Sequence, residues 1–185
     1  MPASFELSVE QLKLISFGPR RDIIAVLANE SDLSAREIAE RLHRRVTALY
    51  RHLDALVESG LIRQSGSRPG SKRPQSLFAL AAPLYSAQKA TETAQGRAAY
   101  AQAATRYAAA ASRKFSRAMR NGTARPFADD ANVSLSNVDL QLDRASLVEL
   151  HKLLRDFLTS ARKLRVHGKD GLEPVTLTIL IAPSR

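Results

Sequence analysis

Apolar residues in the first part of the chain recur at helical spacing. Val9 to Ile15 is long enough for one short helix, and Pro19 stands near the start of a second, whose stripe is Ile23, Ile24 and Leu27. Between these and the next apolar run, Ser34 and Glu37 have the spacing of a capping box. A third helix is therefore expected to begin at Ser34.

A fourth helix follows after a short turn, in the stretch VTALYRHLDALVESGLI that spans residues 46–62. Leu49, Leu53 and Leu56 make its apolar stripe, and Gly60 stands where a C-cap glycine is expected. Leu61 and Ile62 then start a strand, and LFAL at 77–80 returns after a run rich in Gly, Pro and Ser. Helix, short turn, helix and basic hairpin are typical of a winged helix-turn-helix.

The following residues, from about Leu84 to Met119, are rich in alanine and predict one long helix, in which Gly96 marks a bend. Alanines recur along it in alternating steps of three and four, which is a heptad seam. We expect this seam to pair two copies of the chain, through Ala101, Ala104, Tyr107, Ala108, Ala111 and Phe115. Packing of the helix on its own domain is the alternative.

The last segment has the pattern strand, helix, strand. Val133 to Leu142 alternates with one slip of phase, Asp143 precedes an amphipathic helix, and Val175 to Ile181 alternates again. Two strands and one helix are too little to stand alone. This unit is expected to complete a dimer or to hold an effector.

These patterns together predict an α+β fold that is mostly α. The expected divisions are a winged helix-turn-helix at residues 1–82, a long linker or dimerisation helix at 83–125, and a β-α-β unit at 126–185.

Charge is distributed unevenly over these divisions. The chain of 185 residues has a formal net charge of +10, and no acidic residue occurs between Glu58 and Glu92. The first division carries +3, the second +7 and the third zero. Such a balance favours an anionic partner, either nucleic acid or an acidic surface. The winged helix favours double-stranded DNA.

The outer row of the fourth helix suits that partner. Thr47, Tyr50 and Arg51 face away from the leucines, although Asp54 on the same face disfavours deep insertion. Further DNA contacts are expected from Arg44 and Arg45 in the turn, and from Arg68, Lys72 and Arg73 in the hairpin. The alternative is that this charged face is only solvated and binds no partner.

The residues LSAREIAERL and VTALYRHLDALVESGLI resemble the winged-helix repressors of the arsenical-resistance-repressor (ArsR) type. The resemblance covers about residues 9–82 and implies a dimeric DNA-binding transcription regulator, with Thr47, Tyr50 and Arg51 at the major-groove positions. The chain departs from the metal-sensing members because it has no cysteine. It also has Arg44 and Arg45 where a turn of small residues is more usual.

Other chemistry finds little support. No catalytic constellation, cofactor motif or metal-ligand spacing occurs, and His43, His52, His151 and His167 stand apart from one another. With no signal peptide, no membrane-length apolar run and no cysteine, a cytoplasmic protein is expected.

We therefore expect a homodimeric, sequence-specific transcriptional repressor acting on a near-palindromic operator, with no enzymatic activity. A small-molecule effector is possible but unidentified. The alternative is an interaction or scaffold protein, or an architectural protein, which uses the winged helix for protein, RNA or non-specific DNA contacts.

Overall fold

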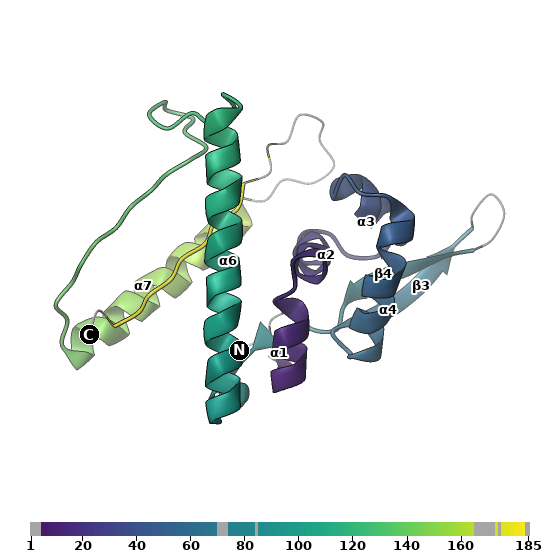
Figure 1. Ribbon diagram of the computed structural model, residues 1–185, viewed down its shortest axis with the longest axis horizontal. Helices are drawn as coiled ribbons and strands as arrows, with labels where there is room; N and C mark the ends of the chain where they lie inside the picture. Colours follow the sequence, from purple (N-terminus) through teal and green to yellow (C-terminus); the bar gives the residue numbers. More distant parts are fainter. Residues whose placement is uncertain (1–4, 70–73, 84, 165–172, 174, 184–185) are drawn as a thin grey trace. The chain divides into compact units, whose positions relative to one another are not determined.

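A computed structural model describes residues 5–69, 74–83, 85–164, 173 and 175–183 (Figure 1). The chain divides into two compact units, Met1–Ala110 and Ala111–Arg185. The division between them falls inside the long helix, so that helix belongs to both units. The three divisions expected from the sequence, with boundaries at residues 82 and 125, remain a prediction.

The helices of the first unit begin and end close to the expected positions. They are α1 (Val9–Ile15), α2 (Gly18–Asn29), α3 (Ala35–Arg41), a 3-10 turn (Val46–Ala48) and α4 (Tyr50–Glu58). The capping box at α3 is confirmed, because Ser34 Oγ accepts from the Glu37 N–H and the Glu37 carboxylate accepts from the Ser34 N–H. Ser8 and Gln11 form a second capping box at α1.

A three-stranded sheet completes the winged helix. Its order is β2 (Leu33–Ser34), β4 (Gln75–Leu80) and β3 (Ile62–Arg68), and all pairings are antiparallel. The register of β3 on β4 shifts between Gln64 and Gly66, which is a bulge. Gly60 adopts φ 72°, so the left-handed residue after α4 is a glycine, as predicted.

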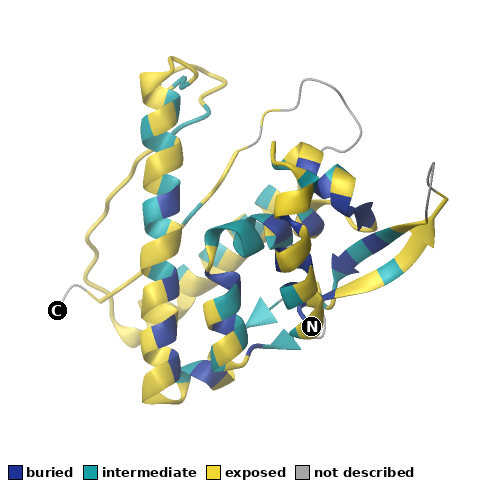
Figure 2. Cartoon of the chain, turned by 45° about the vertical axis from the view of Figure 1, so that its right-hand side comes forward, coloured by how far each residue is buried: buried dark blue, intermediate teal, exposed yellow. Residues whose placement is uncertain are grey.

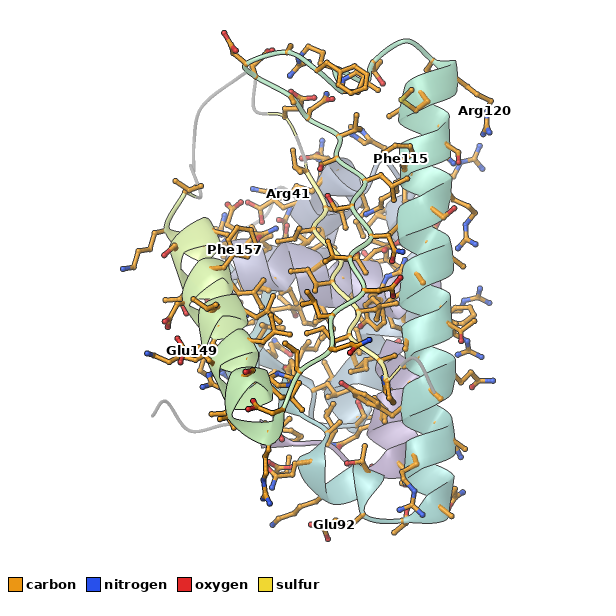
Figure 3. The ribbon with its side chains drawn as sticks, turned by 90° about the vertical axis from the view of Figure 1, so that its left-hand side faces the viewer. Arg41, Glu92, Phe115, Arg120, Glu149 and Phe157 are labelled. Carbon is orange, nitrogen blue, oxygen red and sulfur yellow. The ribbon has the colours of Figure 1, made fainter. Side chains whose placement is uncertain are left out.

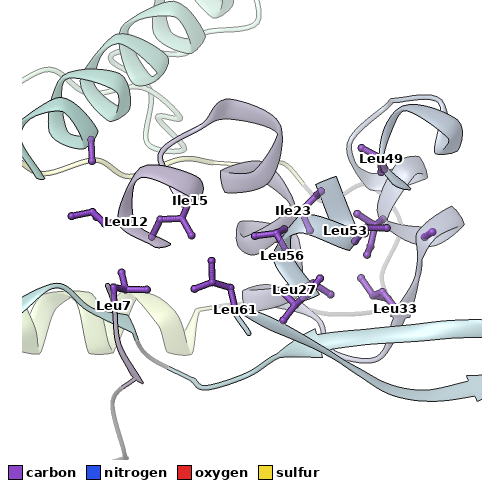
Figure 4. Close-up of a cluster of buried hydrophobic side chains, with 14 of the residues drawn as sticks. Leu7, Leu12, Ile15, Ile23, Leu27, Leu33, Leu49, Leu53, Leu56 and Leu61 are labelled. Atoms are coloured by element: carbon purple, nitrogen blue, oxygen red, sulfur yellow. The ribbon is translucent and has the colours of Figure 1, made fainter. Parts of the chain in front are cut away.

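The core of this unit is built from leucine and isoleucine on one face of each element. The side chains that are 0% exposed include Leu49 just before α4, Leu53 and Leu56 of α4 and Ile23 of α2 (Figure 4). Ile38 of α3 is also 0% exposed. Burying each such side chain contributes about 1.5–3 kcal/mol. This packing holds α4 with its leucine face inward and leaves its other face to solvent.

The alanine-rich region is not one continuous helix. It begins with β5 (Tyr85–Ser86), which pairs in parallel with β1 (Phe5–Glu6), and with the short α5 (Gln88–Thr91). The long helix α6 then runs Ala94–Arg120. Thr93 starts it by accepting the Gly96 N–H on Oγ1 at 3.0 Å. The alanine content predicted one continuous helix and did not indicate this break. The break depends on the side-chain cap by Thr93 and on the packing of α5.

Within the first unit α6 buries a face different from the expected seam. Gly96, Ala99, Ala103 and Ala110 are its buried residues. Arg106 of the same helix donates to Ser16 Oγ at 2.8 Å. These residues pack on the helix's own unit. For this face, the alternative to a dimer seam, in which the helix packs on its own domain, is therefore correct. The seam lies on another side of α6.

In the described part of the second unit, one helix follows the end of α6. Helix α7 (Arg144–Lys163) follows its N-cap Asp143, whose carboxylate accepts the Ser146 N–H at 2.7 Å. The predicted strands at 133–142 and 175–181 are wrong for this single chain, since neither segment has strand structure. Alternation supplies a strand's two faces, but a strand also needs a hydrogen-bonded neighbour.

One polar cluster joins distant parts of this unit. Arg125 contacts Asp130 at 2.9 Å and Glu173 at 2.7 Å, and Asn132 also donates to Glu173. The cluster brings residue 173 beside residues 125 and 132, so the segments that follow Asn132 and Glu173 start close together. The Glu173 hydrogen bonds from Arg125 and Asn132 lower the pKa of its carboxyl.

Candidate nucleic-acid interface

The outer face of α4 and of the turn before it carries the side chains that the sequence singled out. Thr47, Tyr50 and Arg51 are all exposed, and Tyr50 has 51% of its surface open to solvent. Directly beneath them Leu49 and Leu53 are fully buried. A rigid, well-packed inner face therefore fixes where the outer side chains point.

Thr47 differs from the other two in its local structure. It lies in the 3-10 turn Val46–Ala48, and the α-helix itself begins only at Tyr50. Neither the turn nor α4 has a side-chain cap, and neither has an acidic residue in its first turn. Uncapped N–H groups at this end attract anions, and the macrodipole adds a partial positive charge.

Arg44 and Arg45 flank this end of the helix but differ in their partners. Arg44 lies 3.5 Å from Asp22 of α2, whose carboxylate also contacts Arg21 at 3.0 Å. Among the residues that the structure describes, Arg45 has no ion pair. Asp22 is a residue that the sequence reasoning missed, because no spacing rule links positions 22 and 44.

Of the three basic residues predicted in the wing, the structure describes Arg68. Arg68, from which a DNA contact is expected, is held by two contacts within the domain. Its guanidinium pairs with Glu37 at 3.0 Å and donates to the Asp32 carbonyl at 2.7 Å. Lys72 and Arg73 lie outside the described residues.

Glu37 thereby serves two purposes, as a capping-box residue and as the partner of Arg68. Burial opposes its ionisation, but the hydrogen bonds from Ser34 and the Arg68 guanidinium outweigh burial and lower the pKa of this carboxyl. The Arg68 side chain consequently links the wing to α3 through an ion pair. It is less available to a phosphate than a solvated arginine.

A groove runs between α4 and the wing. Tyr50 and Asp54 line it from α4, and Gln64, Gln75 and Ser76 line it from the strands. Asp54 and Glu58 on its wall disfavour a phosphate at that end, whereas Gln64 and Ser76 offer neutral donors and acceptors. The positive side of the interface is therefore the end near Arg44, Arg45 and Arg51.

His52 lies behind this face and not on it. It is 6% exposed, its ring lies 5.8 Å from that of Phe17, and its Nδ1 has no hydrogen-bond partner among the described residues. Burial, together with the nearby charges of Arg51, Arg20 and Arg44, lowers the pKa of His52. A protonated His52 is thus disfavoured in the folded domain.

The expected dimer residues on α6 do not share one environment. Ala101 is exposed, and Ala104, Ala108, Ala111 and Phe115 are partly buried. Tyr107 lies under the guanidinium of Arg21, at 5.4 Å from its ring centroid, so it contacts its own unit. Burial raises the pKa of the Tyr107 hydroxyl.

Two negative findings concern the described residues. No cluster of three or more His, Cys, Asp or Glu side chains among them could hold a metal ion. In that same part of the chain, no helix combines the length and apolar character needed to cross a membrane.

Comparison with known proteins gives partial matches. The family model described as HVO_A0114 matches residues 18–79, which is the helix-turn-helix and wing. A search of curated proteins found no match. HlyU from Vibrio cholerae N16961, in its reduced form, is 28% identical over 37% of this chain, with a TM-score of 0.30, and the match spans just under two thirds (66%) of HlyU.

Two solved structures match over more of the chain. RV1404 from Mycobacterium tuberculosis is 18% identical, with 82% of this chain and 84% of that chain covered and a TM-score of 0.32. A MarR family transcriptional regulator from Rhodococcus sp. RHA1 is 19% identical, with coverages of 83% and 81% and a TM-score of 0.31. The chain is similar to these proteins. Its winged-helix fold is evident from its own helices and three-stranded sheet.

Proposed function

We propose that the protein is a sequence-specific, DNA-binding transcriptional repressor of the ArsR-like, non-metal-sensing type. It acts in the cytoplasm, without a cofactor or enzymatic activity. One observation carries this proposal: Thr47, Tyr50 and Arg51 form an exposed row over the 3-10 turn and the start of α4, and the leucines beneath that row are fully buried. A helix held in this way can enter a major groove and read base edges.

Each contact has its own chemistry. Arg51 has a planar fork that matches guanine O6 and N7, Thr47 reaches a base or a phosphate, and Tyr50 stacks on a sugar or donates to a phosphate. Arg44 and Arg45 bind phosphates beside the helix end. Lys72 and Arg73 contact the backbone or the minor groove from the wing, and Arg68 adds only a lesser contact because Glu37 holds it.

The protein binds as a homodimer, with one half-site of a near-palindromic operator for each subunit. The alanine seam of α6 brings the two copies together through Ala101, Ala104, Ala108, Ala111 and Phe115, with Tyr107 at its edge. Half-sites about one helical turn apart match two recognition helices related by a two-fold axis.

Fluorescence anisotropy tests this function. The protein's own upstream promoter region is compared with a scrambled duplex of equal length at physiological salt. We expect at least a ~100-fold preference for the promoter, since specific binding exceeds non-specific binding by about 10³ or more at full operators. Equal, salt-sensitive binding to both duplexes would indicate an architectural protein, and no binding to either would favour a scaffold.

Two variants assign the face. Arg51→Ala should lower the preference between the duplexes by about 1–3 kcal/mol, because one bidentate base contact is lost. Lys72→Ala with Arg73→Ala should weaken binding to both duplexes and flatten the salt dependence by about two charges. Lys152→Ala on α7 removes a positive charge elsewhere and is the control. If Arg51→Ala matches this control, α4 is not the reading helix.

A further inference from the structure

The second unit exposes far more apolar surface than the first. Of the 21 large hydrophobic residues that are exposed in the described part of the chain, 16 lie in residues 111–185. Helix α7 has no buried residue, and Phe157 on it is 52% exposed (Figures 2 and 3). Exposed apolar surface of this extent marks an interaction site.

The apolar residues follow the pattern of a sheet covered by a helix. Val175, Leu177, Ile179 and Ile181 alternate along one segment, with exposures of 67%, 54%, 40% and 46%. Leu140 and Leu142 alternate along the other. Among the described residues no backbone hydrogen bond joins either segment to a neighbour. Such segments have the side-chain pattern of strands and lack only a ladder.

The first unit offers no surface that matches. Its core is closed, and among its described residues the five exposed large hydrophobics are Phe17, Val57 and three tyrosines. The largest apolar surface on this chain that can cover the second unit is therefore the second unit of another copy. Residues 126–185, which hold the two alternating segments and α7, carry eight basic and eight acidic residues, so these parts of two copies meet without net repulsion.

The size of the surface fits a stable dimer. The exposed area of these 16 residues is on the order of 1,000 Å², and a standard interface takes about 800 Å² from each partner. We propose that the second unit is completed by a second copy of this chain, whose segments 133–142 and 175–181 supply the missing strand partners and whose α7 covers the sheet.

This inference rests on the proposed homodimer but names a surface separate from the α6 seam. The full-length chain is studied by sedimentation velocity from about 1 to 100 μM. We expect a dimer for the wild type, and at least a 100-fold increase in the dimer dissociation constant for Phe157→Asp and for Leu177→Asp. Val57→Asp, which places the same charge on an exposed apolar residue of the first unit, is the control and stays dimeric.

Hydrogen exchange gives a second readout that needs no variant. Backbone amides at 133–142 and 175–181 should exchange slowly at dimeric concentrations and at least ten times faster on dilution to monomer. A monomeric wild type, or amides protected equally at all concentrations, would overturn the proposal. A dimer that Ala108→Asp breaks and Phe157→Asp does not would also overturn it. That result would still support a dimer through the α6 seam and would not contradict DNA binding.

Discussion

Arg44 Nη2 lies 3.5 Å from Asp22 Oδ2, so an acidic residue of α2 contacts a proposed phosphate-binding arginine beside α4. The same carboxylate contacts Arg21 at 3.0 Å, and Arg21 lies over the ring of Tyr107 on α6. These three contacts connect the long helix with the turn that precedes the recognition helix.

The first prediction concerns this acidic residue. Asp22→Asn removes the charge that competes with phosphate for Arg44, so we expect binding to any duplex to tighten about two- to five-fold, with a salt dependence steeper by up to about one charge. Anisotropy titrations at several salt concentrations measure both effects. Asp156→Asn on α7 changes the net charge equally, and an equal effect in that variant would assign the gain to overall charge.

The second prediction concerns the turn after α3. His43 adopts φ 50°, which costs a residue with a Cβ about 1–2 kcal/mol. His43→Gly relieves this cost but adds backbone entropy to the unfolded chain, so we expect a net stabilisation of up to about 1 kcal/mol. Urea unfolding measures it. His43→Ala keeps the Cβ and should show no gain, and equal stabilities for the two variants would contradict the strain.

The third prediction concerns the start of α6. A Cβ on Gly96 would meet the Ala90 carbonyl oxygen at 1.6 Å, which is backbone and has to move. Although alanine favours a helix by about 0.5–1 kcal/mol over glycine, we expect Gly96→Ala to destabilise the protein by about 1–3 kcal/mol. Gly66→Ala, where nothing lies within 4 Å, is the matched control in urea unfolding. A more stable Gly96→Ala would show that α5 can move away at little cost.

The fourth prediction concerns His52. Because burial lowers its pKa in the folded state below the ordinary 6.5, the unfolded chain binds more protons as the pH falls through 6.5. The free energy of unfolding should therefore decrease from pH 7 towards pH 5.

Removal of the imidazole tests this sign. His52→Leu should flatten the decrease between pH 7 and 5, as measured by urea unfolding at several pH values. His151→Gln on the exposed face of α7 should leave the decrease unchanged. An undiminished decrease in His52→Leu would mean that other groups cause it.

Local rules sufficed for much of the first unit. The capping box Ser34–Glu37, the leucine stripe of α4 and the glycine after it depend on residues within about one helical turn, and each is present as predicted. The outward positions of Tyr50 and Arg51 followed from the same period, because burying one face of a helix exposes the other. Thr47 is exposed as well, although it lies in the 3-10 turn before α4.

Tertiary contacts decided what local rules left open. The Arg68–Glu37 and Arg44–Asp22 pairs join residues 31 and 22 positions apart, so no periodicity indicates them. The break between α5 and α6 arises where Thr93 caps a new helix and Gly96 packs on Ala90, although the alanine content favours continuity.

The sequence by itself determined which residues make helices in the winged domain, and which face of each is apolar, because both depend on spacing along the chain. Only the tertiary structure decided which face of α6 packs on its own unit and which arginines are paired. It also decided that the alternating segments at 133–142 and 175–181 form no ladder within one chain, because a strand is completed by a neighbour, and a neighbour is a property of three-dimensional packing.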